Sequence, residues 1–333
     1  MSYDNIRGCG LKNRHIGGTL FGTAIAAYLF FGGTGAGACC VLSVMALNVP
    51  RDAVCRRGAS LSKRRPIQAF SPSDAYRHLF GSAFAASFVV LAAGAILLVS
   101  DVGTASAPLL LAANPTPTLV SFGAFVLAAA LALSAALGLI WGVRGRCVGY
   151  RVVRLLEWAM LVDGLALAAY TGLLLSSMPA VPIWHTPWLP VLFVASSLSC
   201  GCALVVACAC LSGSASSFRT VIGRASSIDI AILVAEALAA IGFVITALSS
   251  PYEVAVQGAH SLLSGTFGAL FLLGFAAIGL VVPVVVESAM AFLRRRAPGA
   301  LLIASSAVLA GGFALRYCIV AVGAHPEVWT VIQ

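Results

Sequence analysis

Long apolar runs separated by short polar stretches form the main pattern of this chain. Each run is long enough for a helix across a bilayer, which needs about 20 apolar residues. None alternates apolar and polar positions as the strand of an outer-membrane barrel would. The pattern therefore predicts an all-α polytopic membrane protein with eight transmembrane helices, at residues 17–47, 80–100, 118–142, 152–176, 188–211, 227–249, 260–288 and 299–322. The first and seventh are long enough to tilt, and Pro283 would help bend the seventh.

Composition leads to the same class. The 333 residues are 60% hydrophobic and only 9% charged, whereas a soluble domain carries about 25% charged residues. So few charges cannot cover a globular surface in water. We therefore expect one integral membrane domain over residues 1–333, located in the cell membrane. The N-terminal residues lack the apolar core and cleavage site of a secretory signal, so we expect the first helix to be retained.

Basic residues alternate along the chain and predict its topology. Sixteen of the twenty Lys and Arg residues lie in 48–79, 143–154, 212–226 and 289–298, while 101–117, 177–187, 250–259 and 323–333 contain none. Basic connections stay on the cytoplasmic side, so both termini are expected to be extracytoplasmic. The net charge of +9 is thereby assigned to the cytoplasmic face. Anionic membrane lipid is its simplest partner, and no nucleic acid is expected.

The connection between the fourth and fifth segments is crowded with prolines and tryptophans. Four prolines interrupt the helix and stiffen the turn: Pro179, Pro182, Pro187 and Pro190. Trp184 and Trp188 favour the headgroup layer. One interpretation is an aromatic belt on a rigid loop. The other is the rim of a ligand pocket or a docking surface.

Acidic residues inside a bilayer are costly and so mark candidate functional sites. The fourth segment contains Glu157, Asp163 and, two turns further, Tyr170, while the sixth contains Asp229 and, two turns further, Glu236. A carboxyl group removed from water holds its proton more tightly, which suits a proton carrier at neutral pH. We therefore expect a polar ladder across the membrane. The alternative is that these acids only pair with Arg154, Arg224 or Arg316, or bond neighbouring helices.

Metal and haem sites are not expected. The "CGCALVVACAC" stretch (200–210) puts neighbouring thiols on opposite sides of a helix, so the cysteines are interpreted as small packing residues. The glycine-rich "FFGGTGAG" (30–37) is likewise interpreted as a packing face. A transmembrane haem needs facing axial ligands at depth, whereas the histidines fall at or beyond predicted helix ends.

A short similarity links the first and fifth segments. "LFFGGTGAGACCVL" and "LFVASSLSCGCALV" both place Leu-Phe before a run of small residues, and both helices would run in the same direction. A duplicated unit is therefore expected, giving two packed four-helix bundles.

Five stretches resemble, in order, the NrfD / polysulfide-reductase membrane-subunit family: "YLFFGGTGAG" (28–37), "SDVGTASAP" (100–108), "NPTPTLVSFGAFVL" (114–127), the long stretch 157–204, and "GGFALRYCIVAVGAHPE" (311–327). The resemblance implies a membrane anchor that binds menaquinone or menaquinol and carries no haem. It also implies two partners, a four-cluster ferredoxin-like iron–sulfur subunit and a molybdopterin catalytic subunit.

The resemblance further implies an extracytoplasmic quinone pocket. In the family a tyrosine of the fourth helix and a histidine near the first helix line the site, and these match Tyr170 and His15. Quinone carbonyls need donors, and histidine titrates in the range that proton transfer requires. The full set of candidates near that end is His15, Tyr170, Trp184, His185, His260, Arg316 and Tyr317. For any single histidine, a plain interfacial residue is the alternative.

Three functions stay open. The first is a quinone-coupled electron-transfer anchor, with the proton path as an added feature. The second is a secondary transporter that uses mid-membrane acids, which would show broken helices at related positions. The third is a scaffold that binds no quinone.

Overall fold

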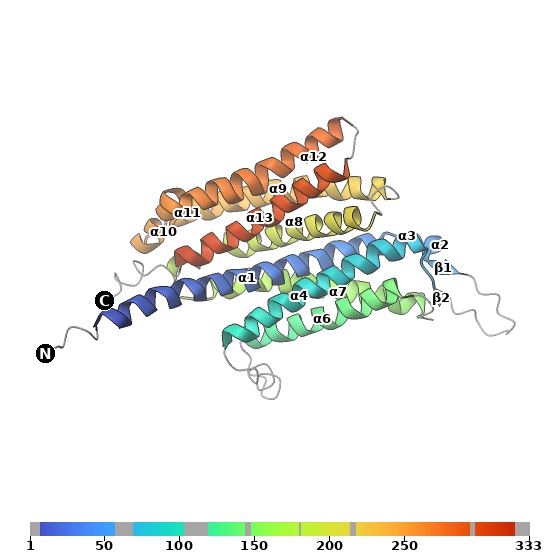
Figure 1. Cartoon of the computed structure of the whole chain (residues 1–333), viewed down its shortest axis with the longest axis horizontal. Helices are drawn as coiled ribbons and strands as arrows, with labels where there is room; N and C mark the ends of the chain where they lie inside the picture. The colour runs from blue at the N-terminus through green and yellow to red at the C-terminus, as the bar shows by residue number, and fades with distance from the viewer. Residues whose placement is uncertain are drawn as a thin grey trace.

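Eight helices long and apolar enough to span a membrane are present in the described part of the chain (Figure 1). The computed structural model describes residues 7–56, 69–102, 119–143, 148–179, 181–213, 218–293 and 297–323. The spans have 24 to 27 residues, or about 36–40 Å at the α-helical rise, which exceeds the hydrocarbon thickness of about 30 Å. The predicted fold class is confirmed, and the chain is a multi-pass integral protein of the cell membrane.

The helices follow the predicted order. They are α1 (Arg7–Leu47), α4 (Ser82–Val102), α6 (Leu119–Gly142), α7 (Tyr150–Ser176), α8 (Trp188–Leu211), α9 (Arg219–Leu248), a seventh span and α13 (Pro298–Gly323). The short α3 (Asp74–Tyr76) and a π-helical turn, η1 (Arg77–Gly81), lead directly into α4. The seventh span consists of α11 (Gly265–Ala269), a π-helical stretch η3 (Leu270–Val281) and α12 (Val282–Phe292). Pro283 stands at the start of α12, directly after the π-helical stretch.

The seventh span begins later than the predicted 260–288. Residues Glu253–Leu263 instead form a separate helix, α10. Ser264 then adopts an extended backbone conformation, and Gly265 has φ +71°, a value that favours glycine. His260 therefore lies on α10 and outside the spanning helix.

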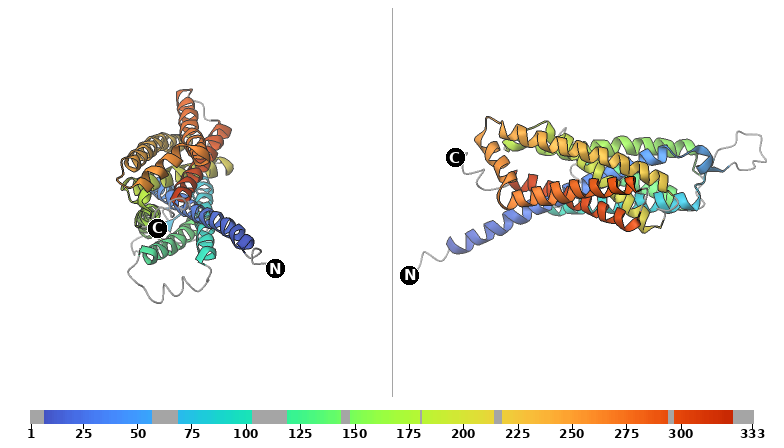
Figure 2. Two further views of the ribbon diagram at one scale, coloured as in Figure 1. Left: turned by 90° about the vertical axis from the view of Figure 1, so that its left-hand side faces the viewer. Right: turned by 90° about the horizontal axis from the view of Figure 1, so that it is seen from above.

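The spans form two groups of four, as the internal similarity predicted. Helices α1, α4, α6 and α7 form the first bundle, and α8, α9, the seventh span and α13 form the second (Figure 1). The helices run lengthwise alongside one another (Figure 2). The seam is α1 against α8, where a Cβ on Gly37 would lie 1.7 Å from the carbonyl oxygen of Ser197. Small residues allow this backbone contact.

The two ends of the molecule differ. At one end α1 begins and α13 ends, together with α10 and the 3₁₀ turn η2 (Pro182–Trp184); we call this the terminal end (Figure 1). At the other, the basic end, α1 finishes, α7 and α9 begin, and α2 (Arg51–Val54) leads into the antiparallel pair β1 (Cys55–Arg56) and β2 (Ala69–Phe70). The connections rich in Lys and Arg therefore join helices at one end, as their alternation predicted.

Candidate functional site

A fully buried arginine lies where α1, α8 and α13 meet. Arg316 of α13 is 0% exposed. Its Nη1 donates to the Ser196 hydroxyl at 3.0 Å and to the Gly312 carbonyl at 3.1 Å, and its Nη2 donates to the Ser197 hydroxyl at 2.9 Å. The guanidinium carbon lies 5.3 Å from the ring centroid of Phe193. Burying a cation costs several kcal/mol unless such contacts compensate, so this helix crossing is built around the charge.

Glycine makes the space for the guanidinium. A Cβ on Gly33 of α1 would lie 2.7 Å from both Arg316 Nη2 and Ser197 Oγ. A Cβ on Gly312 would lie 2.3 Å from the sulfur of Cys200. The glycine-rich stretch of α1 and the "GGFALR" stretch of α13 therefore serve close packing around one buried charge.

Acids of the second bundle continue from this arginine toward the basic end. Glu236 of α9 is 3% exposed, hydrogen-bonds the Ser196 side chain and interacts electrostatically with Arg316. Two turns nearer the start of α9, Asp229 is also 3% exposed and interacts with Ser199 of α8, Glu236 and Glu287 of α12. We call Arg316, Ser196, Glu236, Asp229 and Glu287 the polar row.

A small cavity of about 10 Å³ borders the last member of the polar row. Glu287, Ser226 and Ser227 line it. This volume is about that required for one water molecule with polar partners. The polar row therefore ends beside a site with room for a water, near the start of α9 at the basic end.

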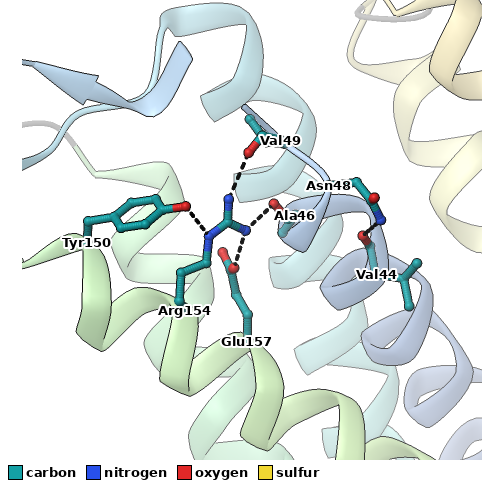
Figure 3. Close-up of polar contacts among 7 residues, drawn as sticks. All are labelled: Val44, Ala46, Asn48, Val49, Tyr150, Arg154 and Glu157. Atoms are coloured by element: carbon teal, nitrogen blue, oxygen red, sulfur yellow. Dashed lines mark hydrogen bonds and ion pairs between the residues drawn. The ribbon is translucent and has the colours of Figure 1, made fainter. Parts of the chain in front are cut away.

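The acids of α7 have different partners. The Glu157 carboxylate pairs with Arg154 at 2.9 Å. Arg154 also donates to Tyr150 Oη at 2.7 Å and to the carbonyls of Ala46 and Val49 at the end of α1 (Figure 3). This is the pairing with Arg154 that the sequence left open as the alternative to a proton path.

Asp163 is half-buried and interacts with Cys39 and Cys40 of α1. Its Oδ2 has no hydrogen-bond partner among the described residues. The structure thus brings Asp229 and Glu236 together in the second bundle. In the first bundle Glu157 pairs with Arg154 of its own helix, and Asp163 interacts with the thiols of α1.

Aromatic rings gather at the crossing of α1 and α13, next to Arg316. Tyr317 is half-buried and stacks with Phe313 at 6.3 Å between centroids, and Phe313 meets Phe30 edge-on at 5.6 Å. Phe31 packs on Phe30 at 5.5 Å. Phe313 is 36% exposed, toward the lipid. We call Phe30, Phe31, Phe313 and Tyr317 the aromatic face.

The remaining predicted quinone residues are spread over the terminal half. Trp184 is buried, and its indole nitrogen donates to the Ile319 carbonyl at 3.0 Å. Tyr170 belongs to the first bundle, where its ring fills the space beside Gly123 of α6. His185 and His260 are exposed. The side chain of His15 lies outside the described residues.

Sequence reasoning missed three parts of this site. Ser196 and Ser197, which receive the arginine, were visible in the "ASSLSCGC" stretch as hydroxyls in an apolar helix. Glu287 was visible as an acid near the end of the seventh apolar run. Phe313 precedes Arg316 by three residues, so its position on the same face of α13 could have been inferred from helical spacing.

Metal-ligating residues do not gather within the described part of the chain: no group of three or more His, Cys, Asp or Glu side chains is placed to hold an ion there. The buried cysteines Cys39, Cys40, Cys200 and Cys202 are free thiols in helix interfaces.

Comparison with known proteins gives consistent matches. The sequence model of the family "Polysulphide reductase, NrfD" matches residues 12–325. The C subunit of polysulfide reductase from Wolinella succinogenes is 31% identical over 176 residues, covering 53% of this sequence and 56% of that protein. Protein NrfD of Escherichia coli is 31% identical over 175 residues, covering 52% and 54%. The chain thus spans about half the length of the curated relatives it matches.

Proposed function

Since the chain belongs to the polysulphide reductase NrfD family, we propose that it anchors an oxidoreductase complex in the membrane and exchanges electrons between menaquinone and a docked iron–sulfur subunit. Its relatives include a subunit of polysulfide reductase. The observation that carries the proposal is the aromatic face beside the buried Arg316, in the terminal half where the quinone residues were predicted.

The residues present fit a quinone. A quinone ring needs a flat apolar surface and hydrogen-bond donors at its carbonyls, and ligand sites combine such apolar walls with few polar groups. Phe313 and Tyr317 provide a surface that is reachable from the lipid, and Tyr317 provides a hydroxyl donor. Tyr170, His15, Trp184, His185 and His260 remain candidates for its surroundings.

The polar row suits proton transfer from this site. A bound quinol supplies two electrons and two protons. Ser196 lies between Arg316 and Glu236, so a hydroxyl links the buried arginine to a carboxyl group that can accept a proton and pass it on. Asp229, Glu287 and the small cavity continue from it toward the basic end. Glu157 is paired with Arg154 and takes no part in this transfer, whereas Asp163 is a separate candidate for proton conduction.

We place the terminal end on the extracytoplasmic side, because the basic connections favour the cytoplasm. A partner with iron–sulfur clusters would then dock over the terminal end, and a molybdopterin subunit would complete the complex. The chain itself offers the lipid-side binding site and leaves substrate chemistry to those partners.

The transporter alternative lacks support from the helix geometry. Paired broken helices at matching positions in the two halves would favour it. The π-helical Leu270–Val281 interrupts the seventh span, while the matching third span is one continuous α-helix, Leu119–Gly142.

Quinone titration into the purified full-length protein in lipid nanodiscs tests the proposal. Binding of a menaquinone analogue should weaken at least tenfold in Phe313→Ala and several-fold in Tyr317→Phe. Phe292→Ala is the matched control, since Phe292 is 88% exposed on α12 at the basic end. Equal affinity in all three variants would contradict the aromatic face as the site. Weakening only in Tyr170→Phe would move the site to the first bundle.

A further inference from the structure

A second cavity, of about 740 Å³, lies in the half toward the basic end. Residues of α1 and α7 from the first bundle and of α8 and α9 from the second line it. It therefore sits at the boundary between the two bundles. Its volume is in the range of ligand sites, about 300–1,000 Å³.

The cavity is elongated along the membrane normal. On α9 its lining runs from Val221 to Ile232, a rise of about 16 Å along a helix. This matches one leaflet, which is half of a hydrocarbon core about 30 Å thick. Several lining side chains are exposed on the lipid-facing surface, among them Val44 at 45%, Leu165 at 41% and Ile228 at 57%. The cavity is thus open sideways to the bilayer.

The deep part of the lining is apolar. It includes Leu161, Leu198 and Ile232, with the thiols of Cys40 and Cys202 as its polar atoms. The Cys40 thiol already faces the Leu161 carbonyl. No histidine or hydroxyl of the described lining residues reaches this depth to bind a quinone carbonyl, so a hydrocarbon tail fits better than a quinone ring.

A cation stands at the shallow end. Arg224, in the first turns of α9, lines the cavity and is exposed. The structure shows it with no ion pair or hydrogen bond to another described residue. The amide of Asn48, another polar group of the lining, already donates to the Val44 carbonyl. A guanidinium that bonds none of the described side chains, at headgroup depth above an apolar slot, is complementary to an anionic phospholipid.

We propose that this cavity binds one anionic phospholipid, with an acyl tail between the two bundles and the phosphate on Arg224. The lipid fills the space between α1 and α9 and helps to hold the bundles together. This site lies in the opposite half from the aromatic face and does not depend on the proposed quinone chemistry.

Native mass spectrometry of the full-length protein tests this site. The protein is released from nanodiscs that contain phosphatidylglycerol and phosphatidylethanolamine in equal amounts. We expect one retained phosphatidylglycerol per protein molecule, reduced at least fivefold in Arg224→Ala. Arg151→Ala is the matched control, because Arg151 is also exposed at the basic end but does not line the cavity; it should retain the lipid.

A second variant blocks the slot and leaves the charge in place. Val44→Trp should also reduce retention at least fivefold, whereas Val162→Trp, at a 65% exposed position of α7 outside the cavity, should not. Added phosphatidylglycerol should raise the thermal midpoint of the wild type and not of Val44→Trp. Unchanged retention in both cavity variants, equal retention of phosphatidylethanolamine, or a quinone found in place of the lipid would overturn the proposal. Circular dichroism verifies that each variant is folded.

Discussion

Arg154 and Arg316 are both arginines of transmembrane helices that bond across to other helices, but their surroundings differ. All three nitrogens of Arg154 have partners, including the Glu157 carboxylate and the last carbonyls of α1. Arg316 is fully buried, its Nε has no partner among the described residues, and it reaches Glu236 through Ser196.

The hydrogen-bond partners of the two arginines favour different roles for them. Arg154 donates to the Ala46 carbonyl in the last turn of α1 and to the Val49 carbonyl just beyond it, which is a common role for a cation at a helix C-terminus. Arg154 uses four of its five N–H donors on protein partners, so little of its hydrogen-bonding capacity is left for a ligand. Arg316 keeps spare hydrogen-bonding capacity at greater cost. We infer that Arg154 and Glu157 stabilise the structure, whereas Arg316 and the polar row serve the function.

Removing the charge of Arg316 should have the largest effect. Arg316→Met leaves Ser196, Ser197 and Glu236 buried without their cation, and we expect a loss of about 4 kcal/mol in the free energy of unfolding. Quinol-linked turnover of the assembled complex should also fall at least tenfold. Denaturant unfolding in mixed micelles gives the first value. A stability within about 1 kcal/mol of the wild type would show that the arginine is dispensable.

Disrupting the contact between α1 and α8, which positions Ser196 and Ser197, should have the second largest effect. Gly37→Ala would place a Cβ 1.7 Å from the Ser197 carbonyl oxygen, so α1 and α8 must separate, at a cost of about 3 kcal/mol. Gly32→Ala is the control, because no atom lies within 4 Å of its added Cβ. Similar melting temperatures for the two variants would contradict backbone contact at this seam.

Removing Arg154 at the basic end should reduce the stability less. Arg154→Met removes the side-chain donor from the Ala46 and Val49 carbonyls and the partner from Glu157. The Arg154 side chain is 17% exposed, however, so water can reach the gap. We expect a loss of about 2 kcal/mol in the free energy of unfolding. Turnover per folded molecule should stay within twofold of the wild type. A tenfold loss of turnover at normal stability would make this cluster functional after all.

Removing the single hydroxyl of Ser197 should have the smallest effect on stability. Ser197→Ala removes one of the three hydrogen bonds of Arg316, which is worth about 1.5 kcal/mol for a charged donor. Thermal unfolding should show the loss, and Ser176→Ala, at the end of α7, should not. No change in Ser197→Ala would mean that Ser196 and Gly312 hold the guanidinium alone.

The sequence predicted the fold well because apolar runs and charge alternation carry it. All eight spans overlap their predicted ranges, and the start of the seventh was wrong only because Ser264 and Gly265 turn the backbone where hydropathy stays high. The pairing of acids was harder to predict. Helical spacing put Asp163 with Tyr170 and Asp229 with Glu236, but it could not indicate which neighbouring helix each pair faces.

The most direct test of the account is the rate of menaquinol-linked electron transfer by the complex carrying Glu236→Gln, compared with Glu157→Gln. Both variants replace one buried carboxyl by an amide of the same shape. The account predicts at least a tenfold loss for Glu236→Gln and a change of less than twofold for Glu157→Gln. Equal rates in the two variants, or the loss in Glu157→Gln alone, would contradict it.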